Sequence, residues 1–525
     1  MRPRTRLWAS ALVALTVAVG AGCTAPDAGP TAEPTGTEYR AGTLRVLASS
    51  ELSDMKPVLD AAAAKTGVTV RPTWAGTLDA VEQIVSGKAD GQYDAVWLAS
   101  NDYMRLRPES TGRISSETPV MTSPVAIGVK PEKLRQLGWR PDDVTWSQLH
   151  QAVADGKLTY GMTDPERSNS GFSALISVAS ALSGAQSALT DADVAEATPR
   201  LEEFFAGQKL TSGSSGWLAT TYKRRGTVDA LVNYESVLMS TPGLTVIRPK
   251  DGVVTADYPF TLLTSAPQEA RESGRALTEY LRTPEAQRAI TEKTFRRPVV
   301  ASVRPATGLA AGQRRELPFP GSRSVADGLL DAYENKLRRP SRTVYVLDTS
   351  GSMEGERMEG LEQALLRLTG EFREREEVTL MPFGTDVKAL YTHTLDPSDP
   401  EAARKAIERD VNQLTPHGDT AIFTSLLHAY RYLGQTPEGG HQDAFTSIVL
   451  MTDGENTTGA SAEGFETYYR GLPPGQLRDT PVFPILFGDS DRAELERIAG
   501  LTGGRLFDAQ KGSLDGAFEE IRGYQ

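Results

Sequence analysis

Three side chains that can bind a cation stand at alternate positions directly after an apolar run. They are Asp348, Ser350 and Ser352. The segment before them, Thr343–Leu347 ("TVYVL"), has the continuous apolar character of a strand buried on both faces of a parallel sheet. In an extended turn the three side chains can project toward one point. The same residue types are also common helix N-caps, so the triplet alone leaves two interpretations, a cation site or a cap.

Two later segments supply oxygen ligands of the same kind. Thr420 opens a predicted helix, and Asp453 follows the apolar strand Ser447–Thr452. In a doubly wound sheet, ligands lie outside the carboxyl ends of the strands, so we expect both residues near Asp348. Carboxylates, hydroxyls and water suit a hard, six-coordinate cation such as Mg²⁺ or Mn²⁺. Together the five residues predict a metal site, and a simple helix cap becomes a poor explanation.

The elements around these residues predict a doubly wound, Rossmann-like α/β domain over residues 341–525. Apolar residues recur at spacings of three and four after the triplet, which is typical of one buried helix face. They are Met358, Leu361, Leu365, Leu368 and Phe372. Further strands are predicted at Val378–Phe383, Ser447–Thr452 and Val482–Phe487.

This pattern resembles the metal-ion-dependent adhesion site of von Willebrand factor type A domains. The D-x-S-x-S motif of that family falls on Asp348, Ser350 and Ser352, its threonine on Thr420, and its T-D-G on Thr452–Gly454. The resemblance implies that the hydroxyls bind the ion directly and that the aspartates often act through water. It also implies an open metal position for the Asp or Glu carboxylate of a protein partner, and therefore binding without turnover.

The preceding part of the chain alternates strands and helices. Strands are predicted at Thr43–Ser49, Val68–Trp74 and Tyr93–Ser100, with helices at Asp54–Thr66 and Leu78–Ser86 between them. This order predicts right-handed crossovers and a parallel sheet. Residues 301–340 begin as loop-like sequence and continue as a helix near 325–338, which we interpret as a connector between two domains.

Residues 43–300 resemble the bacterial extracellular solute-binding proteins, which are two-lobed, periplasmic-binding-protein-like receptors of ABC importers. Four segments carry the resemblance: "VLASSEL", "MTDPERSNSGFSAL", "VNYESVL" and "YLRTPEAQRAI…FRRPV". The resemblance implies a small solute and an ABC permease as partners.

Serines at predicted junctions of strands and helices are the candidate solute ligands. Hydroxyls and free N–H groups at helix N-termini bind anions without a formal positive charge, although each serine could equally be a plain N-cap. The candidates are Ser49, Ser50, Ser100, Ser168 and Ser170. Glu235, in "NYES", is a weaker candidate for the same cleft.

The N-terminus predicts export and a lipid anchor. Arg2, Arg4 and Arg6 precede the apolar run Leu7–Val19, as in a signal peptide over residues 1–22. Cys23 is the only cysteine and follows small residues, which resembles the lipobox of bacterial lipoproteins, with Gly20 where that motif usually has an aliphatic residue. The alternative is a secretory signal with a free cysteine. Residues 23–42, rich in Pro, Thr and Gly, predict a disordered tether on the extracytoplasmic face of the membrane.

The length, the net charge and the absence of catalytic motifs favour a multidomain binding protein. The 525 residues exceed the roughly 250–300 that one core accommodates, so at least two domains are expected. A net charge of −12 without a Lys/Arg stripe argues against a nucleic-acid partner, and no motif of a hydrolase, P-loop enzyme or zinc protease occurs. We therefore expect a lipid-anchored, non-enzymatic binding protein. The alternative is the substrate-binding lipoprotein of an ABC importer with an accessory adhesion domain.

Overall fold

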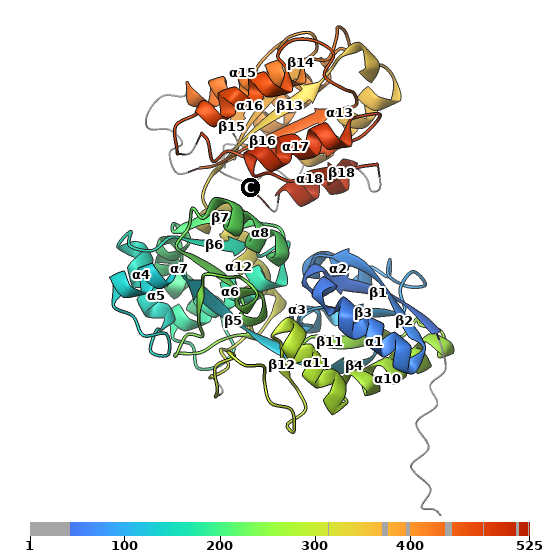
Figure 1. Ribbon diagram of the computed structural model, residues 1–525, viewed down its shortest axis with the longest axis vertical. Helices are drawn as coiled ribbons and strands as arrows, with labels where there is room; N and C mark the ends of the chain where they lie inside the picture. Colours follow the sequence, from blue (N-terminus) through green and yellow to red (C-terminus); the bar gives the residue numbers. More distant parts are fainter. Residues whose placement is uncertain are drawn as a thin grey trace, which may run out of the picture. The chain divides into compact units, whose positions relative to one another are not determined.

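The computed structural model describes residues 42–525 apart from 313, 370–375, 395–398, 436–443, 476, 511–513, 523 and 525. These residues form an N-terminal α/β domain and a C-terminal α/β domain (Figure 1). The predicted signal peptide, Cys23 and all of the predicted tether except Gly42 lie outside the described residues. In the described part of the chain, none of the helices has the length and apolar character of a membrane span.

The first sheet of the N-terminal domain confirms the predicted parallel core and adds two distant strands. Its order is β2–β1–β3–β11–β4, in which β1, β2 and β3 are parallel and β11 runs antiparallel to both β3 and β4. The strands are β1 (Gly42–Ser49), β2 (Val68–Ala75), β3 (Ala95–Trp97), β4 (Ile114–Pro119) and β11 (Pro259–Leu263). Its helices include α1 (Lys56–Thr66), α2 (Thr77–Val85), α3 (Asp102–Arg105), α10 (Gln268–Leu281) and α11 (Pro284–Thr294).

The second sheet of this domain has the order β10–β5–β8–β6–β7, and β9 and β12 also pair with β5. Its strands are β5 (Met121–Val129), β6 (Tyr160–Thr163), β7 (Gln208–Ser212), β8 (Ala230–Tyr234), β9 (Thr245–Ile247), β10 (Thr255–Ala256) and β12 (Arg297–Pro298). Its helices are α4 (Pro131–Leu137), α5 (Trp146–Ala154), α6 (Asn169–Ser183), α7 (Asp191–Phe205), α8 (Ser215–Arg225) and α9 (Glu235–Met239). Two sheets, each with its own helices, make the predicted two lobes.

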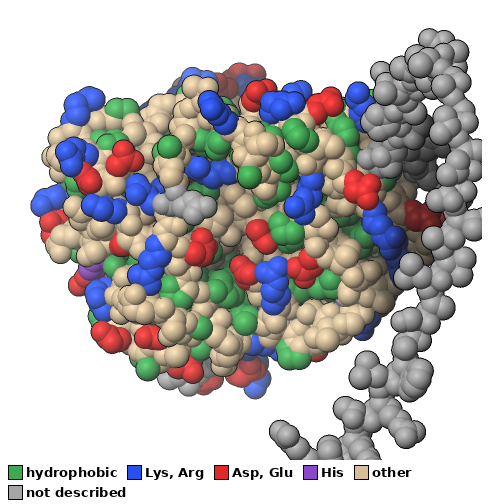
Figure 2. Space-filling view, turned by 90° about the horizontal axis from the view of Figure 1, so that it is seen from below, with side chains coloured by type: hydrophobic (Ala, Val, Ile, Leu, Met, Phe, Trp, Pro, Cys, Tyr) green, Lys and Arg blue, Asp and Glu red, His purple; other side chains and the backbone are tan. Residues whose placement is uncertain are grey.

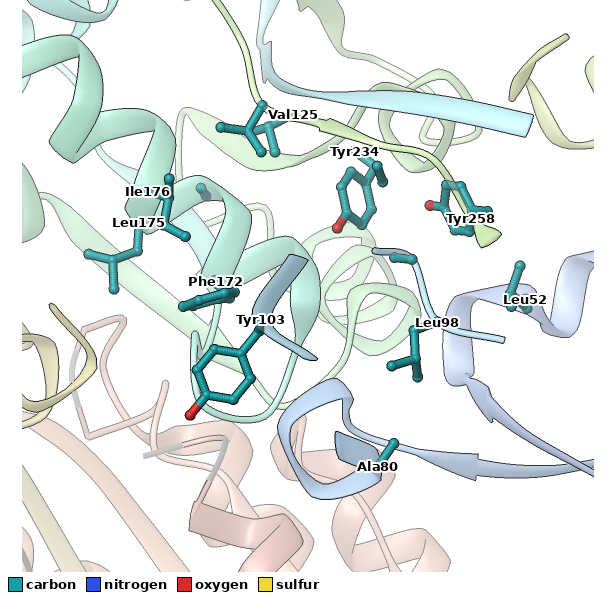
Figure 3. Packing of buried hydrophobic residues seen from close by; sticks show 14 of the residues in the cluster. Leu52, Ala80, Leu98, Tyr103, Val125, Phe172, Leu175, Ile176, Tyr234 and Tyr258 are labelled. Carbon is teal, nitrogen blue, oxygen red and sulfur yellow. The ribbon is translucent and has the colours of Figure 1, made fainter. Parts of the chain in front are cut away.

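Aromatic side chains help to fill the core of the N-terminal domain. The rings of Tyr103 and Phe172 meet edge to face with centroids 5.4 Å apart, and those of Tyr234 and Tyr258 lie 6.0 Å apart (Figure 3). Tyr103 comes from α3 and Phe172 from α6, so side chains from both halves of the domain share one hydrophobic cluster. On the face shown in Figure 2, basic and acidic side chains are interspersed.

The predicted connector, residues 301–340, packs largely on the N-terminal domain. Helix α12 (Arg323–Ala332) continues into a π-helical turn (Tyr333–Leu337). The apolar residues of this segment, including Leu329 and Tyr333, are buried in the same cluster as the two lobes. The Tyr333 ring also packs edge to face on Phe205 at 5.3 Å. The sequence showed the helix, but the surface on which it packs is formed by residues more than a hundred positions away.

The C-terminal domain is a doubly wound sheet of order β15–β14–β13–β16–β17–β18, parallel except for the edge strand β15. The strands are β13 (Ser341–Asp348), β14 (Glu376–Phe383), β15 (Tyr391–Thr394), β16 (Phe445–Thr452), β17 (Val482–Leu486) and β18 (Phe507–Asp508). The helices are α13 (Glu356–Thr369), α14 (Pro400–Val411), α15 (Ile422–Gly434), α16 (Ala462–Gly471), α17 (Arg492–Thr502) and α18 (Leu514–Arg522).

Strand β13 is buried along its whole length because both faces of the sheet are covered. Tyr345 and Leu347 belong to one hydrophobic cluster, and Val344 and Val346 belong to another. Alternate side chains of a strand point to opposite faces, so the two clusters lie on the two sides of the sheet. This confirms the predicted Rossmann-like fold.

The start of β14 is held by a buried ionic cluster, and removing its carboxylate should be costly. Glu376 accepts hydrogen bonds from Arg338 Nη2 at 2.8 Å and from Arg522 Nη2 at 3.1 Å. We expect Glu376→Ala to lower the free energy of unfolding of the C-terminal domain by about 3–5 kcal/mol, because two buried guanidinium groups would each lose a carboxylate partner. Urea denaturation measures this loss. The control is Glu401→Ala, an exposed partner of Arg404, which should change stability by less than about 0.5 kcal/mol. A loss below about 1 kcal/mol for Glu376→Ala would contradict the account.

Candidate functional site

Asp348 ends the central strand of the C-terminal domain and organises the loop that follows. Its side chain is fully buried; one carboxylate oxygen accepts the Ser350 backbone N–H at 2.8 Å, and the other accepts the Thr452 hydroxyl at 2.6 Å. Burial raises the pKa of Asp348, and the hydrogen bonds from Thr452 and Ser350 oppose this rise. The carboxylate therefore joins the ends of two neighbouring parallel strands, β13 and β16.

A chain of hydroxyls leads from this loop to the second aspartate. Ser350 Oγ lies 3.0 Å from Ser352 Oγ, and the Ser352 hydroxyl donates to Asp453 Oδ1 at 2.9 Å. Asp453 is fully buried at the end of β16. The structure thus brings four of the five predicted metal ligands into one hydrogen-bonded network.

The fifth predicted ligand, Thr420, lies in a loop that is tied to the same place. The Gly351 N–H donates to the Gly418 carbonyl at 2.9 Å, which joins the Thr420 loop to the loop after β13. Thr420 itself is buried; its N–H donates to Thr457 Oγ1 at 2.9 Å, and its carbonyl accepts the Thr457 N–H at 2.8 Å. Thr457 therefore holds the backbone of Thr420 through both its N–H and its carbonyl.

Sequence reasoning missed the residues that support these loops. Thr349 donates through both its N–H and its hydroxyl to the Phe383 carbonyl at 2.8 Å, and its own carbonyl accepts Lys388 Nζ at 2.7 Å. Gly488 adopts φ 58°, and a Cβ added there would lie 2.8 Å from Asp453 Cβ, so this turn needs glycine. Local sequence gives no signal for these contacts, because each joins loops from different strands.

Arg357 is the most important missed residue, since it places a positive charge at the site. Its guanidinium, from the first turn of α13, donates to Asp453 Oδ2 and, at 2.7 Å, to Asp489 Oδ2. These acceptors raise the pKa of Arg357. The buried Asp453 carboxylate pairs with the guanidinium of Arg357, which shows that the space beside Asp453 favours a positive charge.

The donor set fits a hard divalent cation. Two carboxylates and three hydroxyl-bearing residues converge on one edge of the sheet, and oxygen ligands of this kind suit Mg²⁺ or Mn²⁺. The described residues contain no group of three or more His, Cys, Asp or Glu side chains arranged to hold a metal, which is expected because this set is mostly hydroxyl. Asp348 and Asp453 supply the charge, and Ser350, Ser352 and Thr420 supply neutral oxygens.

A second cleft, of about 900 Å³, lies between the lobes of the N-terminal domain, and its lining also includes Arg505 of the C-terminal domain. Of the six predicted solute ligands, Ser49, Ser50 and Ser168 line it. Ser49 ends β1, and Ser168 is the N-cap of α6, as the pattern of strand ends and helix starts predicted. Ser170 lies behind Ser168, and its hydroxyl is 3.0 Å from the Ser168 hydroxyl.

Two predicted solute ligands lie elsewhere, and the prediction is corrected for both. The Ser100 hydroxyl accepts the Asp102 N–H at 3.0 Å, which is the local capping role that the sequence left open. Glu235 is buried at the start of α9, where its carboxylate accepts two hydrogen bonds from Arg297 at 2.6 and 2.8 Å and lies 3.5 Å from Arg248. Because these arginines hold it, Glu235 is a structural ion-pair partner. Cleft residues that the sequence analysis missed are Glu51, Trp74, Thr77, Arg167 and Asn169.

Family comparisons match each of the two domains and leave residues 297–343 between them unmatched. A family model described as bacterial extracellular solute-binding protein matches residues 44–296, and one described as von Willebrand factor type A domain matches residues 344–520. The chain joins a bacterial extracellular solute-binding domain to a von Willebrand factor type A (VWA) domain. Both resemblances seen in the sequence are thereby confirmed, whereas the lipobox at Cys23 stays a prediction.

The similar proteins share only parts of this chain. Inter-alpha-trypsin inhibitor heavy chain H3 of Bos taurus is 29% identical over 154 residues, which cover 29% of this chain and 17% of that protein. Heavy chain H4 of Homo sapiens is 27% identical over 195 residues, covering 35% of this chain and 20% of that protein. The chain therefore spans a fifth or less of the length of these two relatives.

Solved structures show weaker likenesses. The periplasmic binding protein AfuA from Actinobacillus pleuropneumoniae aligns with TM-score 0.46 and 13% identity, over 56% of this chain and 98% of that one. A von Willebrand factor type A structure from Catenulispora acidiphila aligns with TM-score 0.30 and 18% identity, over 36% of this chain and 43% of that one. At these scores, the assignment of both domains depends on the family matches.

Replacing Arg357 tests whether its charge compensates the buried carboxylates of the VWA domain. We expect Arg357→Gln, without divalent metal, to lower the free energy of unfolding by about 1–3 kcal/mol, because Asp453 loses a charged hydrogen-bond donor. Added Mn²⁺ should restore more stability to this variant than it adds to the wild type. Urea denaturation with and without Mn²⁺ measures both effects. Arg404→Gln, which removes a surface partner of Glu401, is the control. Equal metal responses in Arg357→Gln and the wild type would contradict the prediction.

Proposed function

We propose that the VWA domain binds Mg²⁺ or Mn²⁺ and, through the ion, an Asp or Glu carboxylate of a protein partner. The observation that carries the proposal is the single network of Asp348, Ser350, Ser352 and Asp453 at the ends of β13 and β16. Thr420, in the loop joined to it, completes the donor set. When bound, the ion would supply a Lewis-acidic position for an anionic oxygen.

The charges of these residues favour a shared ion. Both oxygens of Asp348 already accept hydrogen bonds, so this carboxylate serves mainly to orient the serine loop. Ser350, Ser352 and Thr420 are neutral, and Asp453 also pairs with Arg357, so these residues would compensate the charge of the ion only in part. An Asp or Glu carboxylate of a partner protein would compensate the remaining charge of the ion. A binding role follows from this donor set for that reason. We propose no catalytic residue.

For the whole chain we propose a surface binding protein on the extracytoplasmic side, attached to the membrane by lipid at Cys23. The solute-binding domain would take a small solute in the cleft between its lobes. The second candidate function is delivery of that solute to an ABC permease, and two buried hydroxyls in the cleft support the solute binding that this function requires. Ser49 Oγ and Thr77 Oγ1 hydrogen-bond to none of the described residues, so both are available to a ligand.

Thermal unfolding with and without divalent metal tests the metal site. At a free metal concentration of about 100 times Kd, the VWA domain should gain about 2.7 kcal/mol of stability. Asp348→Ala and Ser352→Ala should each abolish most of this gain, whereas Asp386→Ala, which removes an exposed carboxylate of the same domain, should keep it. An absent shift in the wild type, or an undiminished shift in both site variants, would refute the metal proposal.

A further inference from the structure

Three segments of the N-terminal domain cross from one of its sheets to the other. The chain passes from β4 to β5 at Val120, from β10 to β11 at residues 257–258, and from α11 to β12 at residues 295–296. Among the described residues, the non-glycine residues with positive φ are Tyr258 (φ 43°) and Phe295 (φ 55°). Both lie in these crossings, so backbone conformations that L-residues rarely adopt occur where the angle between the lobes is set.

The second crossing is centred on one residue, Asp257. On its N-terminal side, β10 pairs with β5 of the second sheet. On its C-terminal side, the Tyr258 N–H donates to the Ala99 carbonyl at 2.9 Å, and the Tyr258 carbonyl accepts Nε1–H of Trp97, in β3, at 3.1 Å. Asp257 therefore joins a strand fixed in one lobe to a residue fixed in the other.

The ring of Tyr258 contacts a cation from the third crossing. The Arg296 guanidinium lies 4.8 Å from the centre of this ring and donates to both carboxylate oxygens of Asp54, at 2.7 and 2.8 Å. Arg296 and Tyr258 are both fully buried. The second and third crossings are therefore packed together at this contact, next to Asp257.

The carboxylate of Asp257 lies where negative charge is in excess. Burial raises the pKa of Asp257 to about 6; Arg105 opposes this rise, and the charges of Asp102 and Glu117 add to it. Arg105 is already shared, because Nη1 donates to Asp102 and Nη2 to Glu117, each at 2.7 Å. Asp257 Oδ1 is buried and has no hydrogen-bond partner among the described residues. One guanidinium thus serves three carboxylates, and Asp257 is the least compensated of them.

A fourth carboxylate lies on the other side of the crossing. Glu316 accepts the Thr255 N–H at 2.6 Å and the Thr255 hydroxyl at 2.8 Å, so both of its oxygens are hydrogen-bonded, although burial raises its pKa as well. The guanidinium and the two carboxylates that face Asp257 come from α3 and β4 of the first lobe, whereas Asp257 follows β10 of the second. A change in the angle between the lobes therefore moves Asp257 relative to these charges.

We propose that Asp257 is a proton-dependent switch of the angle between the two lobes. With a proton on its carboxyl group, Asp257 is neutral and stays in its partly buried position. Without the proton, its charge lacks a donor for Oδ1 and faces Asp102 and Glu117, so an opened arrangement in which water reaches the carboxylate becomes populated. The switch needs neither a metal nor a solute, so its test is independent of the proposed functions.

The direction of the pH response follows from the pKa of Asp257. In the observed arrangement this pKa is about 6, whereas a solvated Asp has a pKa of about 3.9. The observed arrangement therefore binds the proton more tightly; it is fully favoured below about pH 4 and loses this advantage as the pH rises to about 6. The ratio of the observed to the opened arrangement should fall by about a hundredfold over this range.

Distances between two spin labels, measured by pulsed electron paramagnetic resonance on the full chain, test the switch. The labels are attached at two exposed positions, Lys65→Cys on α1 and Glu132→Cys on α4, in a chain that also carries Cys23→Ser. This parent chain should show one main distance at about pH 4. A second distance should grow in as the pH rises to about 6, and it should stay constant above about pH 7.

Variants separate the charge of Asp257 from a merely structural role. Asp257→Asn keeps the shape and removes the titrating group, so it should show the low-pH distance at every pH. Arg105→Gln removes the opposing cation and should extend the response to higher pH, whereas Glu117→Gln removes a like charge and should confine it to lower pH. The control is Asp60→Asn, which removes an exposed partner of Lys56 and should respond like the parent chain.

Two results would overturn the proposal. The first is a distance distribution in the parent chain that is the same at about pH 4 and about pH 7. The second is a pH response that Asp257→Asn leaves unchanged. If near-ultraviolet circular dichroism shows that Asp257→Asn does not fold, Arg105→Gln and Glu117→Gln decide: opposite shifts support the switch, and shifts in one direction or none overturn it.

Discussion

Two fully buried carboxylates, Asp348 and Asp453, lie at the ends of neighbouring parallel strands, and the structure of the VWA domain depends on how their charges are compensated. Burying an ionised carboxylate is costly unless it is hydrogen-bonded and paired with positive charge. Here the Ser350 N–H and the Thr452 hydroxyl compensate Asp348, while the Ser352 hydroxyl and Arg357 compensate Asp453. These groups join the segments that follow β13 and β16, and Arg357 also bonds to Asp489 after β17, so the residues that compensate the charges also hold the shape of the site.

The sequence predicted those parts of the fold that local pattern determines. Continuous apolar runs marked β13 and β16, and alternating strands and helices marked the parallel part of the first lobe. Pairings between distant segments were not predictable: β11 joins β3 across more than 160 residues and runs antiparallel to it. Likewise, α12 was recognised as a helix, but its place in the core of the N-terminal domain depends on a surface built by other segments.

For the candidate sites too, residues that a local pattern marks were predictable, and contacts between distant residues were not. Asp348, Ser350 and Ser352 could be found because they are close in sequence, and Asp453 because it ends a strand. Arg357 could not, because its role depends on reaching an aspartate 96 residues away. For the cleft, strand ends and helix starts indicated Ser49 and Ser168, which line it, but also Ser100, whose hydroxyl accepts the N–H of Asp102 at the start of a short helix. A serine before a helix looks the same in sequence whether its hydroxyl faces a cleft or its own backbone.

Both domains place polar oxygens at the carboxyl ends of parallel strands, Ser49 at the end of β1 and Asp348 at the end of β13. The most direct test of the central claim, that the VWA site is built for a divalent cation, is a crystal structure of the chain in Mn²⁺ with anomalous diffraction recorded near the manganese edge. The account predicts one anomalous peak in contact with the hydroxyl oxygens of Ser350 and Ser352, beside Asp453. A map without a peak at these residues, with Arg357 still hydrogen-bonded to Asp453, would contradict it.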